Sequence, residues 1–121
     1  MGLPRAVGSH HTVWIDAPGL REPVPVRYAS DDDTIYCFGD NGLENVPNGE
    51  RVSATVHEIT GKGGHRLAQV SGTLREIDGD DITDDALLEL LAHVSLGRDL
   101  DEVRRNLDHH RARRRILAIG P

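Results

Sequence analysis

The chain is short of several residue types, and each shortage excludes a class of protein. Its 121 residues include one cysteine, Cys37, so an internal disulfide cannot form. No apolar run approaches the roughly 20 residues that a membrane-spanning helix needs. The N-terminus also lacks the apolar stretch of a signal peptide. Because low cysteine content fits a reducing compartment, we expect a cytoplasmic protein that does not enter the membrane.

Aromatic residues are scarce as well. Trp14, Tyr28, Tyr36 and Phe38 are the only ones, and we interpret them as core or dimer-interface residues. Contact of Trp14 or Tyr28 with a flat ring ligand stays open. Cys37 lies in an apolar run with no nearby base to lower its pKa, so we interpret it as a buried structural residue and predict no catalytic residue. Seven histidines show no metal-binding spacing, so no metal site is predicted either.

Positive charge is outnumbered by negative charge. The chain has 14 basic and 20 acidic residues, a net charge of −6 with histidine neutral. Nucleic-acid binding needs a basic surface that displaces counterions, so this balance argues against it. The acidic clusters at 31–33 and 78–81 are interpreted as solvated turns. The basic run from His109 to Arg115 is interpreted as a solvated helix end, with a dimer contact or an anion site as the alternatives.

Six short apolar or alternating runs predict β-strands. They cover residues 12–15, 23–29, 34–38, 51–59, 66–77 and 115–119. Two helices are predicted before the last strand, the first capped by Thr83 and the second by Asp99. Gly72, inside a strand, indicates a bulge or a tight bend. This order predicts a mainly β (α+β) fold, a six-stranded split barrel over residues 11–121 that follows a flexible arm at 1–10.

Several of these runs occur in a familiar order. Pro23-Val24-Pro25-Val26-Arg27-Tyr28 leads through an acidic turn into Ile35-Tyr36-Cys37-Phe38, then come Pro47-Asn48-Gly49-Glu50-Arg51-Val52-Ser53 and Gln69-Val70-Ser71-Gly72-Thr73-Leu74. Over residues 11–77 this ordered set resembles the pyridoxamine 5′-phosphate oxidase-like family. The resemblance implies a split-barrel homodimer that holds FMN, or a deazaflavin in some branches, as a small-molecule ligand at the dimer interface.

The chain departs from the family pattern where the flavin phosphate is usually bound. Relatives commonly carry a Thr or Ser and then a Lys after the strand that ends here at Phe38. This chain instead carries the carboxylates of Asp40 and Glu44, which repel a phosphate. The resemblance therefore implies a different set of cofactor-binding residues, in which cations and hydroxyls supply charge-assisted hydrogen bonds. We expect this set to be Arg27, Tyr28, Arg51, Ser53 and Arg66.

Two classes of function remain open. The first is an FMN- or deazaflavin-binding redox protein, such as a flavin-dependent oxidoreductase of unidentified substrate, in which the flavin carries out the chemistry. The alternative is a cofactor-less split-barrel homodimer that acts as a binding or interaction protein, favoured by the missing Thr and Lys. A third reading, a tetrapyrrole binder, would need an axial ligand such as His57.

Overall fold

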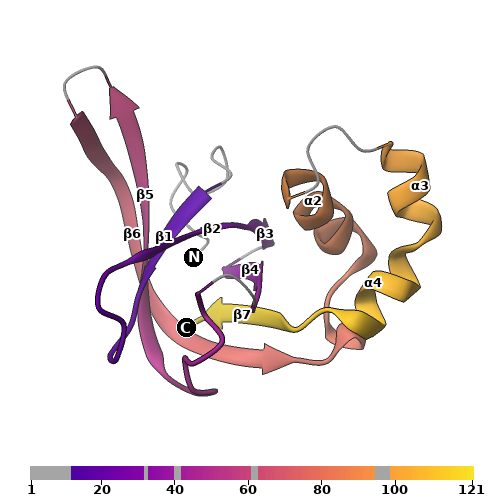
Figure 1. Ribbon diagram of the computed structural model, residues 1–121, viewed down its shortest axis with the longest axis horizontal. Helices are drawn as coiled ribbons and strands as arrows, with labels where there is room; N and C mark the ends of the chain where they lie inside the picture. The colour runs from indigo at the N-terminus through magenta and orange to yellow at the C-terminus, as the bar shows by residue number, and fades with distance from the viewer. Residues whose placement is uncertain (1–11, 32, 40–41, 61–62, 95–98) are drawn as a thin grey trace.

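A computed structural model describes residues 12–31, 33–39, 42–60, 63–94 and 99–121 of the chain (Figure 1). For 58–60 and 63–67 it describes the backbone alone, and the predicted arm at 1–10 lies outside the described residues. The strands are β1 (Thr12–Asp16), β2 (Val24–Arg27), β3 (Ala29–Asp31), β4 (Thr34–Phe38), β5 (Arg51–Thr60), β6 (Gly63–Ile77) and β7 (Ile116–Gly120). The helices are η1 (Gly79–Asp81, a 3-10 turn), α2 (Asp84–Val94), α3 (Leu100–Arg105) and α4 (Leu107–Arg113).

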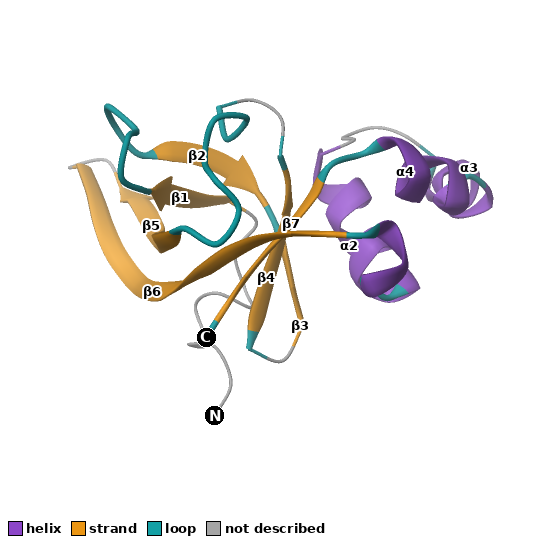
Figure 2. Cartoon of the chain, turned by 90° about the horizontal axis from the view of Figure 1, so that it is seen from below, coloured by secondary structure: helices purple, strands orange, loops and turns teal. Residues whose placement is uncertain are grey.

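In the described part of the chain, seven antiparallel strands form one sheet in the order β2-β1-β5-β6-β7-β4-β3. The two outermost strands, β2 and β3, are consecutive in the chain and separated only by Tyr28, so the sheet nearly closes into a barrel (Figures 1 and 2). The mainly β, barrel-like fold is thus confirmed, with seven strands where six were predicted. The predicted strand 23–29 divides at Tyr28, because β2 pairs with β1 while β3 pairs with β4.

The barrel interior is filled by residues that alternate along the strands. On β5, Val52, Ala54 and Val56 are buried, while Arg51 and His57 are exposed. This alternation is the period of two that a pleated strand imposes, and it removes the apolar side chains from water. The C-terminal strand β7 pairs with both β4 and β6, so it joins the first half of the chain to the second within the sheet. Cys37 is fully buried in this core.

A second core lies outside the barrel, beneath the helices. Ala29, Phe38 and Ile116 point outward from β3, β4 and β7 and pack with buried residues of α2. The Ala86 N–H donates to Thr83 Oγ1 at 3.2 Å, so the predicted cap of α2 is confirmed. In Figure 2 the helices stand to one side of the barrel. They cover only that end of its outer face.

The predicted second helix is divided in the structure. Asp99 does cap α3, since its carboxylate accepts the Asp101 N–H at 3.0 Å. Asn106, with φ −110° and ψ 18°, leaves the helical region and separates α3 from α4. Its side-chain amide donates to the Glu102 carbonyl at 2.9 Å, and this local bond competes with continued helix. Among the described residues no helix is long and apolar enough to cross a membrane.

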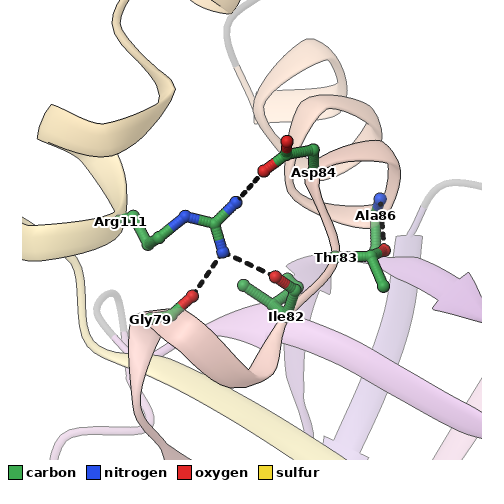
Figure 3. Close-up of polar contacts among 6 residues, drawn as sticks. All are labelled: Gly79, Ile82, Thr83, Asp84, Ala86 and Arg111. Carbon is green, nitrogen blue, oxygen red and sulfur yellow. Dashed lines mark hydrogen bonds and ion pairs between the residues drawn. The ribbon is translucent and has the colours of Figure 1, made fainter.

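Three arginines of the basic run from His109 to Arg115 are bound to protein, whereas His109 and Arg113 are exposed, so the interpretation as a solvated helix end applies to only part of the run. The Arg111 guanidinium donates to the carbonyls of Gly79 and Ile82 and pairs with the Asp84 carboxylate (Figure 3). The Arg114 guanidinium lies 4.5 Å from the centroid of the Phe38 ring, a cation–π contact. Arg115 Nε donates to Glu76 at 2.9 Å. Arg111 thus holds α4 against η1 and the start of α2, while Arg114 and Arg115 connect the end of the helical segment to β4 and β6.

Gly72 marks a close approach of two strands. The pairing of β5 with β6 is regular at Gly72 and shifts between Val56 and His57, so the bulge lies there instead. A Cβ on Gly72 would stand 2.6 Å from the Gly120 carbonyl oxygen, nearer than real Cβ atoms come. Only glycine therefore allows β6 and β7 to come this close.

Candidate functional site

The outer face of the barrel away from the helices is open and polar. Its side chains come from β1, β5, β6, β7 and β4, and Arg51, His57, Ser71 and Arg75 are exposed there. Among the described residues, one hollow lies on this face and a second lies where the face meets η1. Each is built from residues that the strand register brings together from distant parts of the chain.

The first hollow, here called the tryptophan hollow, has a volume of about 230 Å³. It is lined by Trp14, Asp16, Glu22, Pro23, Ser53, Thr55, His57 and Gln69. The register sets Trp14 opposite Thr55 and Asp16 opposite Ser53. The rings of Trp14 and His57 are stacked, with centroids 6.1 Å apart and planes inclined by 24°. An aromatic wall beside hydroxyl groups suits a flat, polar ring system.

The second hollow, here called the trough, has a volume of about 290 Å³. It is lined by Thr34, Tyr36, Thr73, Arg75, Ile77, Asp81, Ala118, Gly120 and Pro121. Ala118 of β7 lies between Arg75 of β6 and Tyr36 of β4 in the register. The small residues of β7 therefore form the floor, and the longer side chains of β6 and β4 form the two walls.

Three of the predicted cofactor-binding residues lie on the open face, but the chain does not bring all of them together. Arg27 pairs with Thr12 at one end of β1, and Ser53 pairs with Asp16 at the other. Arg51 lies two residues beyond Ser53, so about six strand positions, or roughly 20 Å, separate the backbones of Arg27 and Arg51. One chain cannot place both guanidinium groups on a single phosphate in this conformation. Ser53 lines the tryptophan hollow, and Arg51 lies two residues from it on the same strand.

The other two predicted residues are placed differently. Tyr28 lies inside the barrel core with 1% of its surface exposed, so its ring does not reach the open face. Burial, helped by the charge of Glu89, raises the pKa of the Tyr28 hydroxyl to about 12. Its carbonyl oxygen lies 2.8 Å from His93 Nδ1 of α2. The Arg66 backbone pairs with His57, and the Arg66 side chain lies outside the described residues.

The charges around the tryptophan hollow are mixed. Asp16 and Glu22 line it, whereas Arg51 lies two residues from Ser53 on β5 and pairs with Thr73 of β6. In the segment where the family pattern is broken, Asp40 lies outside the described residues, and the Glu44 carboxylate accepts the Gly42 N–H at 2.9 Å. The described residues contain no group of three or more His, Cys, Asp or Glu placed to hold a metal ion.

Sequence reasoning missed the residues of the trough. The alternation of β6 does put Thr73 and Arg75 on one face, and this much is visible in the sequence. Their meeting with Ala118 and Tyr36 depends on pairing across β7, which no local pattern encodes. Asp16 and Gln69 in the tryptophan hollow were missed for the same reason.

A scan of the chain against protein-family models finds no match, and a search of the curated proteins finds none either. Function therefore has to be argued from the open face and its two hollows.

Proposed function

We propose that the chain binds a flavin-class ring, FMN or a deazaflavin, at the tryptophan hollow and works as a homodimer. The observation that carries this proposal is the position of Trp14. It is the single tryptophan of the chain, and its ring lines a hollow on the open face of the barrel. Ring ligands stack on such side chains, and the hydroxyls of Ser53 and Thr55 supply hydrogen bonds at the rim.

The size of the hollow supports a dimer. At about 230 Å³ it is smaller than the range of about 300–1,000 Å³ that encloses a cofactor-sized ligand. A second copy covering the open face would enlarge and close it. The proposed site is thus shared between two chains, which is also what the family resemblance implies.

The residues beside the hollow have two roles in the proposed site: some stack on the ring, and others bind the phosphate. Trp14 and His57 offer the ring surface, while Arg51 and Ser53 lie at the end where β1 and β5 pair Asp16 with Ser53. Arg51 is the cation available to a phosphate there, and Asp16 opposes it. A bound flavin would supply the redox chemistry, and these side chains would orient it. Arg27 and Tyr28 play no part in this version of the site.

The cofactor-less alternative is favoured by a specific observation. Two carboxylates, Asp16 and Glu22, line the hollow, and the Trp14 and His57 rings already stack on each other. If no cofactor binds, the open face is an interaction surface, and the stacked rings of Trp14 and His57 belong to the protein–protein contact. The same experiment separates the two functions.

The test uses the emission of Trp14, which a bound flavin quenches because its absorbance overlaps tryptophan emission. We expect saturable quenching by FMN or a deazaflavin, together with a rise in melting temperature, because a ligand of the native state stabilises it. Sedimentation of the same sample should show a dimer. If saturating ligand changes neither emission nor melting temperature, the flavin proposal is wrong and the interaction protein is the better reading.

Two matched variants localise the binding. Thr55→Phe fills the tryptophan hollow and should abolish quenching by FMN. Thr34→Phe places the same side chain in the trough and should leave quenching within about twofold. Both positions are half-buried threonines on the outer face, so their effects on the fold are comparable. Equal effects of the two variants would contradict the proposed location.

A further inference from the structure

The trough carries two opposite charges that the protein itself does not neutralise. Arg75 and Asp81 both line it, both are exposed, and neither forms an ion pair or a side-chain hydrogen bond with any residue that the structure describes. The neighbouring cation Arg111 is already engaged by Gly79, Ile82 and Asp84 (Figure 3). The Asp81 carboxylate therefore faces the trough without a cationic partner from that side.

An apolar surface separates the two charges. Ile77 lies two residues beyond Arg75 on β6, and Asp81 follows in η1. The Tyr36 ring and the Ala118 methyl group line the trough level with Arg75 and add to its apolar surface. Thr73 and Thr34 add hydroxyls at the other end, around Gly120, where the floor has no side chain. The trough thus presents a guanidinium, an apolar middle and a carboxylate.

We propose that the trough binds a small zwitterion of the amino-acid type, with its carboxylate on Arg75 and its ammonium group on Asp81. Guanidinium and carboxylate form a bidentate, charge-assisted pair, and the threonine hydroxyls can donate to the same carboxylate. An apolar side chain of the ligand packs against Ile77 and Tyr36. The site stands whether or not a flavin binds at the tryptophan hollow.

Charge pattern selects this ligand over simpler ones. A monoanion would satisfy Arg75 but would bring no partner to Asp81, and a monocation would do the reverse. A single molecule that carries both charges, joined by a short apolar body, pairs with both groups at once. The volume of about 290 Å³ is enough for one such molecule.

The experiment titrates the full chain with three probes that share one side chain and differ in their charged groups. These are L-phenylalanine, its amide, which lacks the carboxylate, and N-acetyl-L-phenylalanine, which lacks the ammonium group. Binding is followed by the amide chemical shifts of Ala118 and Gly120 on the trough floor. Because both protein groups are exposed, we expect the amide and the N-acetyl compound to bind about fivefold more weakly than the zwitterion.

Variants assign each charge. Arg75→Gln should bring the affinity for L-phenylalanine down to that of its amide, and Asp81→Asn should bring it down to that of the N-acetyl compound. Arg27→Gln, at an exposed arginine of the outer face that does not line the trough, is the control and should change nothing. Equal affinity for all three probes, or no shift at Ala118 and Gly120, would overturn the proposal. Preference for the N-acetyl compound would overturn it in favour of a simple anion site.

Discussion

Tyr28 is the residue on which two parts of the fold depend. It separates β2 from β3, its side chain is buried in the barrel core, and its carbonyl oxygen lies next to His93 of α2. The local sequence predicts a single continuous strand here. The division arises because the chain at this point pairs with β1 on one side and with β4 on the other, which lets the sheet close.

The raised pKa of Tyr28 predicts a loss of stability at high pH. The folded chain favours the neutral phenol, with a pKa of about 12 against the ordinary tyrosine value of 10.0. The contribution is therefore fully present below pH 10 and is lost as the pH rises toward 12. Two units correspond to roughly 2–3 kcal/mol. Urea unfolding between pH 9 and 12 measures this loss.

The control for this prediction is Tyr28→Phe, which removes the titrating hydroxyl and keeps the ring. Its free energy of unfolding should fall less steeply above pH 10, because the other titrating groups are unchanged. The same slope in both proteins would show that the buried hydroxyl is not the source.

At the scale of elements, Arg111 joins α4 to the turn that precedes α2. Its side chain is 12% exposed and bonds to two carbonyl oxygens and one carboxylate. Hydrogen bonds from a charged donor contribute about 1.5–3 kcal/mol each, and neighbouring bonds do not add fully. We therefore expect Arg111→Ala to lower the free energy of unfolding by about 2–4 kcal/mol, measured by urea denaturation.

Asp84→Asn separates the bonds to the backbone from the ion pair. The Asp84 side chain is 78% exposed, and water screens an ion pair at such a site, so this change should cost less than about 1 kcal/mol. If Asp84→Asn lowered the free energy of unfolding as much as Arg111→Ala does, the ion pair, rather than the hydrogen bonds to the carbonyl oxygens, would hold α4 in place.

At the scale of the whole molecule, the barrel strands and the helices differ in how much free energy their local opening requires. β6 is paired on both sides, by β5 and β7, whereas α3 buries only Val103 and α4 buries no residue in the described structure. Local opening needs less free energy where less apolar surface is buried. We expect backbone amides of α3 and α4 to exchange at least about tenfold faster than the paired amides of β6 from 68 to 77.

Hydrogen exchange followed by mass spectrometry measures this difference on the intact chain. Equal protection of α4 and β6 would contradict it and would mean that barrel and helices open together. A dimer contact through the open face would protect β5 and β6 further, so the comparison at two protein concentrations also reports on association.

Much of the secondary structure was predictable, because its causes are local. The strands at 12–15, 34–38 and 51–59, the caps at Thr83 and Asp99 and the buried face of β5 follow from side-chain alternation and capping chemistry. The break at Asn106 also has a local cause, but a single side-chain bond is too weak a signal beside the continuing helical pattern. Of the candidate site, Ser53 and Arg51 were predicted as cofactor-binding residues; Ser53 lines the tryptophan hollow and Arg51 lies two residues away on the same strand.

What the sequence by itself determined is therefore most of the elements and, along each strand, the face on which a side chain stands, since both depend on neighbours one to four residues away. Only the tertiary structure decided which faces meet. It buried Tyr28, separated Arg27 from Arg51 by roughly 20 Å, and brought Arg75 beside Ala118 and Tyr36. The physical reason is register: pairing between strands far apart in the chain depends on closing the whole sheet around one core.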